Sequence, residues 1–272
     1  MDARNQPIGI FDSGLGGLSV LQHLNEQMPL EHYIYVADSA NVPYGTKSPE
    51  FIVDRAKKIC DFLIAQQCKA IVIACNTATA AAAKYLRAHY PLPIIGMEPA
   101  VKPAALQTRN KKIGVLATEG TLKSTQFAAL LDRFGNDIEV HSQPCHGLPE
   151  LVEAGEIDTE KTKALLGKYM RPMLDANVDT IVLGCTHYPF LAATINEIAG
   201  NQVSLIDTGL AVARHTKDRL AAEELLRLAT PILETARFYT SAPSETTNQV
   251  ISRLWGKEST AQSLPDALMS AS

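Results

Sequence analysis

Two cysteines occupy matched surroundings in this chain of 272 residues. Cys75 lies in "IVIACNTATAAAA" and Cys185 lies in "IVLGCTHYPFLAA". In each copy an apolar run rich in Ile and Val precedes the cysteine, a small polar residue or amide follows it, and a helical pattern begins. A thiol has a pKa of about 8.5, so a few hydrogen bonds can favour either the thiol or the thiolate near neutral pH. The sequence therefore predicts two tunable thiols at equivalent strand ends.

A pair of thiols suits a reaction whose substrate and product are mirror images. To invert an α-carbon, one group removes a proton from one face and a second group supplies a proton to the opposite face. The two groups exchange roles in the reverse direction, so they must have similar chemistry. Carboxylates are too acidic, and lysines too basic, to interconvert as easily. The pair of cysteines therefore favours a two-base 1,1-proton transfer.

Other polar residues follow apolar runs and are candidates for the same site. Asp12 and Ser13 end the first run in "IGIFDSGLGG", where the carboxylate could hold an ammonium group or tune a nearby thiol. His187 follows Cys185 by two positions and could assist the second thiol. The segment "NVPYGTKS" (41–48) suits a substrate-binding loop and equally an ordinary surface turn.

The pattern of the whole chain predicts an α/β fold. Short β-type runs alternate with amphipathic stretches, which is typical of a mostly parallel sheet flanked by helices. We expect strands at 7–12, 33–38, 70–75, 93–97, 112–118, 138–143, 180–185 and 203–207. Helices are expected at 49–66, 209–228 and 245–255, a late strand at 237–242, and a frayed tail from residue 256.

A second duplication indicates two related lobes. "IGIFDSGLGGLSVL" (8–21) precedes Cys75, and the similar "IGVLATEGTLKS" (113–124) precedes Cys185 at nearly the same spacing. Ligands of parallel α/β sheets bind at the carboxyl ends of the strands. If the lobes face each other across a pseudo-twofold axis, the two cysteines lie on opposite sides of one cleft.

The composition excludes several classes of protein. The chain is 46% apolar and 20% charged, with a net charge of −4 and no basic stripe, so nucleic-acid binding is not expected. No apolar run approaches the roughly 20 residues needed to span a bilayer. Residues 1–13 contain no signal-peptide h-region, and we expect a cytoplasmic enzyme that does not bind membranes.

The five cysteines favour free thiols over disulfides or metal ligands. They are odd in number and form no C-x-x-C motif or Cys/His cluster, so no metal site is expected. We expect Cys60, Cys68 and Cys145 to be small buried hydrophobic residues.

Several motifs together resemble those of the glutamate racemases. They are "GIFDSGLGGLSVL", "YVADSANVPYGTKS", "VIACNTATA", "IGVLATEGTLKS" and "IVLGCTHYPFL", in this order across residues 8–210. The resemblance implies interconversion of L- and D-glutamate without any cofactor or metal, which supplies D-glutamate for peptidoglycan. It also implies a homodimer, with one lobe at 1–98 plus 208–272, a second lobe at 99–207, and the active site between them.

The same resemblance implies roles for individual residues. Cys75 would take the proton from D-glutamate, and Cys185 would take it from L-glutamate. Asp12 and His187 match assisting residues, and Glu153 in "LPELVEAGE" matches a helper glutamate. The positions that match substrate-binding residues are Asp12, Ser13, Tyr44, Gly45, Asn76, Thr77, Thr118, Thr121, Thr186 and His187.

The residues also permit other functions. One alternative is a related racemase that acts on aspartate. Aspartate is one methylene group shorter than glutamate, and no sequence motif distinguishes the two substrates. A hydrolase or lyase could use Cys185 as a nucleophile with His187, and Cys75 would then be dispensable. A nucleotide- or effector-binding module would need neither cysteine. "SGLGGLS" imitates a dinucleotide fingerprint, but Ser19 stands where that pattern requires Gly or Ala.

Overall fold

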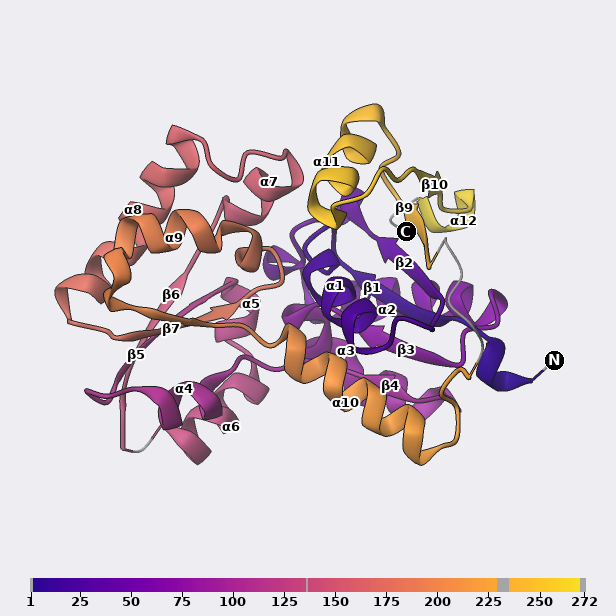
Figure 1. The fold of residues 1–272 in the computed structure, drawn as a ribbon, viewed down its shortest axis with the longest axis horizontal. Helices are drawn as coiled ribbons and strands as arrows, with labels where there is room; N and C mark the ends of the chain where they lie inside the picture. Colours follow the sequence, from indigo (N-terminus) through magenta and orange to yellow (C-terminus); the bar gives the residue numbers. More distant parts are fainter. Residues whose placement is uncertain (1, 136, 229–234, 270–272) are drawn as a thin grey trace.

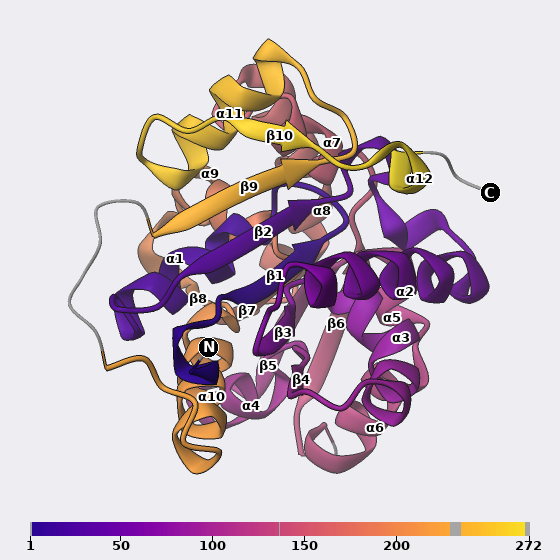
Figure 2. The ribbon, with the colours of Figure 1, turned by 90° about the vertical axis from the view of Figure 1, so that its right-hand side faces the viewer.

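Two parallel sheets form the framework of the protein. The computed structural model describes residues 2–135, 137–228 and 235–269 (Figures 1 and 2). The first sheet has the strand order β10-β9-β2-β1-β3-β4, and the second has the order β6-β5-β7-β8. All strand pairings within these described ranges are parallel. Helices cover the sheets, so the predicted α/β class with two lobes is confirmed.

The strands agree with the apolar runs of the sequence. The first sheet consists of β1 (Ile8–Asp12), β2 (Tyr33–Ala37), β3 (Ala70–Ile73), β4 (Ile94–Ile95), β9 (Ala236–Thr240) and β10 (Ala261–Ser263). The second sheet consists of β5 (Lys112–Ala117), β6 (Glu139–Pro144), β7 (Thr180–Gly184) and β8 (Ser204–Ile206). Every residue of β1, β2, β3 and β7 is buried, as expected for inner strands of a sheet with both faces covered.

Helices connect the strands, and we call each sheet with its helices a lobe. The first lobe carries α1 (Leu18–Gln27), α2 (Pro49–Ala65), α3 (Asn76–His89), α10 (Gly209–Ala222), α11 (Glu245–Trp255) and α12 (Asp266–Met269). The second carries α4 (Val101–Gln107), α5 (Glu119–Leu122), α6 (Thr125–Phe134), α7 (Leu148–Glu153), α8 (Glu160–Asp175) and α9 (Ala192–Ala199). Short 3₁₀ helices are η1 (Ala3–Asn5), η2 (Ser39–Asn41), η3 (Tyr44–Thr46), η4 (Tyr188–Leu191) and η5 (Gly200–Gln202). The lobe boundaries near residues 98 and 207 stay a prediction.

Local sequence signals explain where α2 begins and which face it buries. Ser48 caps the helix by accepting a hydrogen bond from the backbone N–H of Phe51, and Pro49 occupies the first turn, where no donor is needed. Ile52, Ala56, Ile59 and Leu63 are buried, and their spacing of three and four residues places them on one side of the helix.

Two predictions for the C-terminal part were wrong. The tail is not frayed between residues 256 and 268, because β10 pairs with β9 and the side chains of Leu264 and Leu268 are buried. The helix expected over 209–228 ends at Ala222. Glu224 adopts a left-handed conformation (φ 56°), and the N–H of Leu225 bonds to the carbonyl of Leu220, a pattern that terminates helices. Residues 270–272 lie outside the described residues.

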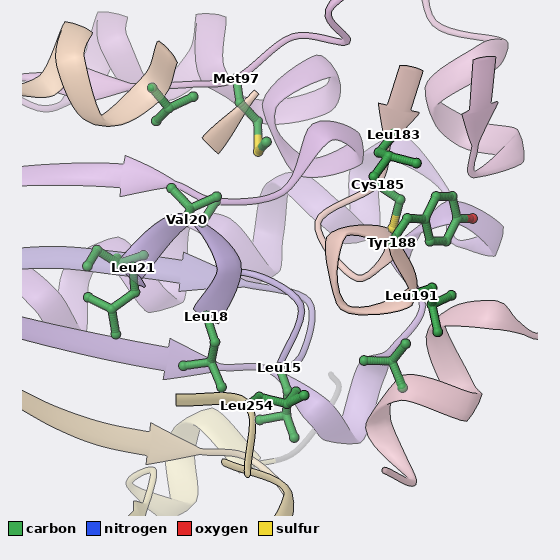
Figure 3. Close-up of a cluster of buried hydrophobic side chains, with 14 of the residues drawn as sticks. Leu15, Leu18, Val20, Leu21, Met97, Leu183, Cys185, Tyr188, Leu191 and Leu254 are labelled. Atoms are coloured by element: carbon green, nitrogen blue, oxygen red, sulfur yellow. The ribbon is translucent and has the colours of Figure 1, made fainter. Parts of the chain in front are cut away.

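One hydrophobic cluster extends from the first lobe into the second (Figure 3). It includes Leu15, just before α1, and Leu18, the first residue of α1. From the second lobe it includes Leu183 in β7 and Tyr188 and Leu191 in η4. Separating the lobes completely would expose these side chains, and each costs about 1.5–3 kcal/mol when moved from the core into water. The cluster therefore keeps the carboxyl end of β1 next to that of β7.

No helix in residues 2–135, 137–228 or 235–269 combines the length and the apolar character needed to cross a bilayer.

A buried ion pair stabilises the amino-terminal edge of the first sheet. Lys69 precedes β3 and Glu31 precedes β2, and their side chains are 1% and 2% exposed. The Lys69 ammonium donates to Glu31 Oε2 at 2.5 Å and to the carbonyls of Arg4 and Leu225 at 2.8 Å. All three donor positions of the ammonium are thus used.

We expect Lys69→Met to lower the free energy of unfolding by about 3–5 kcal/mol, because it leaves the Glu31 carboxylate buried without its cation. Urea unfolding at pH 7 measures the change. Lys163→Met is a suitable control, since Lys163 and Glu197 form an ion pair at the surface, with side chains 32% and 62% exposed, which should contribute little. Equal losses of unfolding free energy in the two variants would contradict the stabilising role of the pair between Lys69 and Glu31.

Candidate active site

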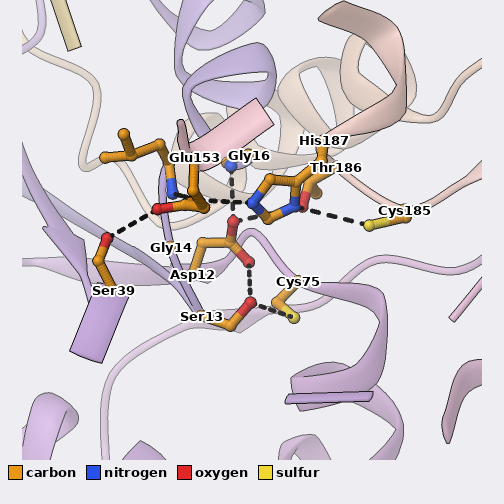
Figure 4. Close-up of polar contacts among 12 residues, drawn as sticks. Asp12, Ser13, Gly14, Gly16, Ser39, Cys75, Glu153, Cys185, Thr186 and His187 are labelled. Carbon is orange, nitrogen blue, oxygen red and sulfur yellow. Dashed lines mark hydrogen bonds and ion pairs between the residues drawn. The ribbon is translucent and has the colours of Figure 1, made fainter. Parts of the chain in front are cut away.

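The two predicted cysteines lie in one polar site between the lobes (Figure 4). Cys75 follows the carboxyl end of β3, and Cys185 follows the carboxyl end of β7. Both are buried, with 6% and 7% of their surface exposed. The hydroxyl of Thr186, in the second lobe, donates to Asp12 Oδ2 at the end of β1 (3.3 Å). The strand ends of the two lobes thus meet at the same place.

Cys75 caps the helix α3. Its sulfur accepts a hydrogen bond from the backbone N–H of Ala78 (3.5 Å), and its thiol lies 3.9 Å from Ser13 Oγ. Burial raises the pKa of Cys75 well above its usual range, and the Asp12 carboxylate raises it further. Cys75 is therefore held as a thiol, and a cation bound nearby would be needed to favour the thiolate.

Cys185 has a different partner. Its sulfur lies 3.6 Å from His187 Nδ1, and His187 Nε2 lies 2.7 Å from Glu153 Oε1. Burial alone would lower the pKa of His187, but its hydrogen bonds with Cys185 and Glu153 raise it well above its usual range. A protonated His187 can therefore serve as both hydrogen-bond donor and countercharge beside Cys185. The duplicated motif supplies two thiols in electrostatically different surroundings.

The backbone after each cysteine also differs. An α-helix begins directly after Cys75, whose following N–H groups can bind an anion. After Cys185 the chain forms the 3₁₀ helix η4, and the α-helix α9 begins only at Ala192. Pro189 explains the difference, because it has no N–H to donate to the carbonyl of Cys185, which instead accepts from Tyr188. The expectation that both cysteines are followed directly by an α-helix thus holds only for Cys75.

Glu153 joins the two lobes at the end of α7. Besides contacting His187, its carboxylate accepts hydrogen bonds from the backbone N–H of Leu15 and from Ser39 Oγ (3.0 Å), both in the first lobe. Sequence reasoning missed Ser39, because a serine in a turn-rich loop carries no distinguishing signal. These contacts fix the position of the Glu153 side chain, unlike that of a freely moving surface carboxylate.

The glycines of "SGLGG" make room for these side chains. A Cβ on Gly14 would come within 2.2 Å of Glu153 Oε1, and one on Gly16 within 2.3 Å of His187 Nδ1. The turn therefore requires glycine because two side chains of the other lobe approach its backbone. This accounts for the resemblance of the segment to a dinucleotide fingerprint without a nucleotide.

The Asp12 carboxyl group lies at the centre of the cluster. Its side chain is fully buried, and Oδ2 accepts a hydrogen bond from the backbone N–H of Gly17 (2.7 Å). Burial raises the pKa of Asp12, and the nearby His187 partly offsets this effect. Ser13 Oγ lies 3.5 Å from Asp12 Oδ1 and connects it to Cys75. A bound ammonium group would find its countercharge here.

Three predicted threonines meet at the interface of the lobes. The Oγ1 of Thr77, from α3, lies 2.8 Å from that of Thr118 and 3.1 Å from that of Thr121, and the latter two lie 3.0 Å apart. Gly45 packs against the same group, since a Cβ there would approach Thr118 Cβ to 2.6 Å. The structure thus places four residues that match substrate-binding positions, from both lobes, next to one another.

Asn76 and Tyr44 present their polar groups differently. The Asn76 side chain is buried, and neither Oδ1 nor Nδ2 has a hydrogen-bond partner within the described part of the chain. Leaving such groups unpaired costs about 1–3 kcal/mol, which a polar ligand would recover. The hydroxyl of Tyr44 donates to Asp38 Oδ2 at 2.6 Å, so only the main chain of Tyr44 is free to serve the site.

The remaining cysteines are buried, as predicted. Burial raises the pKa of Cys68 and of Cys145 to about 12, and that of Cys60 further still. None of the three has a charged partner comparable to Asp12 or His187 among the contacts found in the described residues.

Known proteins resemble this chain over nearly its whole length. A family model described as Asp/Glu/Hydantoin racemase matches residues 8–216. The glutamate racemase of Stutzerimonas stutzeri is 51% identical over 260 residues, which cover 95% of this chain and 97% of that protein. The glutamate racemase of Pseudomonas aeruginosa is 51% identical over 257 residues, covering 94% and 96% of the two chains.

Solved structures agree with this similarity. The Escherichia coli glutamate racemase, solved with L-glutamate and an activator, superposes with a TM-score of 0.84 at 33% identity, covering 95% of this chain and 98% of the other. The Francisella tularensis glutamate racemase, solved with D-glutamate, gives a TM-score of 0.82 at 32% identity, covering 97% and 99%. The resemblance seen in the motifs is confirmed, and the chain belongs to the Asp/Glu/hydantoin racemase family and, within it, to the glutamate racemases.

Proposed function

We propose that this protein interconverts L- and D-glutamate by a two-base 1,1-proton transfer that needs no cofactor, with Cys75 and Cys185 as the two bases. The observation that carries the proposal is the placement of two buried thiols at the strand ends of the two lobes, with Cys75 beside Ser13 and Cys185 beside His187. The names of the relatives, and the solved complexes of two neighbours with L- and D-glutamate, support glutamate as the substrate.

The polar groups around the thiols suit an amino-acid dicarboxylate. We assign the ammonium group of glutamate to the neighbourhood of Asp12, the buried anion. Its carboxylates would bind the backbone N–H groups at the start of α3 and the hydroxyls at the lobe interface. The proposed substrate contacts are Asp12, Ser13, Tyr44, Gly45, Asn76, Thr77, Thr118, Thr121, Thr186 and His187.

In the direction from L- to D-glutamate, the Cys185 thiolate removes the α-proton. The electron pair stays on the α-carbon, where the adjacent carboxyl group and the surrounding donors stabilise it. The Cys75 thiol then delivers its proton to the opposite face, which leaves Cys75 as thiolate and Cys185 as thiol. The reverse reaction uses the same groups with exchanged roles, and exchange with solvent restores the starting state.

The surroundings of each thiol favour the form that this sequence of steps requires. His187, charged through its contact with Glu153, provides a countercharge for a thiolate at Cys185. Cys75 is held as a thiol by burial and Asp12, and the ammonium group of a bound substrate would offset that effect. Closure of the lobes would exclude water and strengthen these interactions.

The cellular role that fits this activity is the supply of D-glutamate for peptidoglycan in the cytoplasm. We also propose that the enzyme is a homodimer whose lobes comprise residues 1–98 with 208–272, and residues 99–207. Proton NMR of the protein with L-glutamate in D2O, followed together with optical rotation, tests the activity. The α-proton signal should vanish while the rotation decays to zero. Parallel samples with aspartate distinguish the related racemase, and no change with either amino acid would refute the proposal.

We expect Cys75→Ser and Cys185→Ser each to lower kcat/KM by about 10²–10⁴-fold, because a serine hydroxyl is too weak an acid to replace a thiol. The two enantiomers have equal free energies, so kcat/KM must fall equally in both directions. Cys60→Ala is the matched control, since Cys60 is buried outside the site and should keep its activity. A Cys75→Ser variant that racemises glutamate at the full rate would refute the two-base account.

We expect Glu153→Gln to shift the basic limb of the pH profile of kcat/KM to lower pH. The neutral amide removes the anionic partner of His187, so the pKa of the imidazolium falls and its proton is lost at lower pH. Profiles measured with both enantiomers should move alike. Glu150→Gln, on the same helix but exposed, is the control. An unchanged basic limb in Glu153→Gln would show that Glu153 does not set the charge of His187.

A further inference from the structure

A second buried carboxylate lies just outside the cysteine site. Asp38 follows the carboxyl end of β2, and its side chain is fully buried. Arg55, on α2, donates to it through both Nε (2.9 Å to Oδ2) and Nη2 (2.6 Å to Oδ1). The Tyr44 hydroxyl donates to Oδ2 at 2.6 Å, and Asn41 Nδ2 donates to Oδ1 at 3.0 Å. Four hydrogen bonds thus converge on one carboxylate.

These bonds hold the loop between β2 and α2 at both ends. Asp38 begins the loop, Arg55 belongs to the helix after it, and Asn41 and Tyr44 lie within it. The Arg55 and Tyr44 side chains are each 1% exposed, so the network is shielded from solvent. The loop then passes Gly45, which lies directly against Thr118 of the second lobe. Its main chain therefore has little freedom to move toward or away from the facing lobe.

We propose that Asp38 and Arg55 are positioning residues that hold the main chain of Tyr44 and Gly45 where it binds substrate. The inference rests on the proposed function, because it assumes that this main chain contacts glutamate. Neither side chain touches the reacting atoms. Arg55 acts on Asp38, Asp38 acts on the Tyr44 hydroxyl, and the ring of Tyr44 fixes the backbone beside Gly45.

The chemistry of the network explains why its members are not interchangeable. A guanidinium group can donate two parallel hydrogen bonds to one carboxylate, whereas an ammonium group acts as a point charge. Arg55→Lys keeps the charge but loses the paired geometry. Gly45 already lies within contact distance of Thr118, so a shift of a fraction of an ångström changes both the lobe contact and the substrate contact. Misplacement of a binding group by about 1 Å can lower activity by roughly 100-fold.

The same lobe supplies a matched control for plain stability. The ion pair between Lys69 and Glu31 is equally buried, but it lies at the amino-terminal ends of the strands, away from the site. If the pair between Asp38 and Arg55 served stability alone, breaking either pair would have the same kinetic consequence. A positioning role predicts that only one of them affects substrate binding.

The experiment compares Arg55→Lys, Tyr44→Phe and Lys69→Met by steady-state racemisation of both enantiomers and by thermal unfolding. We expect Arg55→Lys and Tyr44→Phe to raise KM about tenfold or more in both directions with a smaller change in kcat, as for a lost binding contact. The double variant should lose less than the product of the single effects, because both substitutions act through Asp38. Lys69→Met should lower the melting temperature and leave KM unchanged.

Two results would overturn the inference. One is an unchanged KM in both Arg55→Lys and Tyr44→Phe. The other is a rise of KM in Lys69→Met as large as that in Arg55→Lys, which would make the effect one of general stability. Tyr44→Phe removes a single oxygen, so it remains informative if Arg55→Lys does not fold. Failure of the wild-type protein to racemise glutamate would refute the proposed function itself, and this outcome is distinct from wild-type turnover with unchanged KM values in the variants.

Discussion

The burial of two thiols in one site is the constraint on which the rest of this structure depends. A thiolate taken out of water is unfavourable unless a positive charge or hydrogen-bond donors accompany it. On the Cys185 side the protein supplies that charge itself, through His187 and the carboxylate of Glu153. On the Cys75 side it places the Asp12 carboxyl group, which adds to the effect of burial in raising the pKa of Cys75. The two sides of the site are therefore chemically similar but electrostatically complementary.

The fold meets this constraint by bringing residues of both lobes together at the interface between the lobes. Glu153 belongs to the second lobe, yet its carboxylate accepts hydrogen bonds from Leu15 and Ser39 of the first. The Ser19 hydroxyl, in the first lobe, donates to the carbonyl of Thr186 in the second lobe (2.9 Å). This hydrogen bond lies close to the hydrophobic cluster that both lobes share. The contacts that raise the pKa of His187, with Cys185 and Glu153, lie within the second lobe, and the first lobe fixes the position of the Glu153 carboxylate through Leu15 and Ser39. Glu153 therefore takes part both in the contact between the lobes and in the hydrogen bond to His187.

The cysteines and the inner strands could be predicted from the sequence because their signals are local. A continuous apolar run predicts a buried strand, and its repetition before Cys75 and Cys185 indicates two equivalent positions. Ser39 and Glu153 could not be paired in this way, since they are 114 residues apart and neither has a distinctive neighbourhood. The network around Asp38 was missed for a different reason: Asn41, Tyr44 and Arg55 lie within 17 residues of Asp38, but their spacing forms no pattern that indicates a shared carboxylate. The edge strand β10 was missed because it is only three residues long and mostly polar, and because it forms by pairing with β9.

The central claim is that different thiols act on the two faces of the α-carbon, and the position of deuterium after brief reaction in D2O tests it most directly. The protein is incubated with L-glutamate to low conversion, and both enantiomers are separated and analysed by mass spectrometry. A thiol carries one proton, so two bases predict that the new D-glutamate contains deuterium at the α-carbon while the recovered L-glutamate retains hydrogen. D-Glutamate that keeps the original hydrogen, or L-glutamate that exchanges as fast as product forms, would point to a single base and contradict the account.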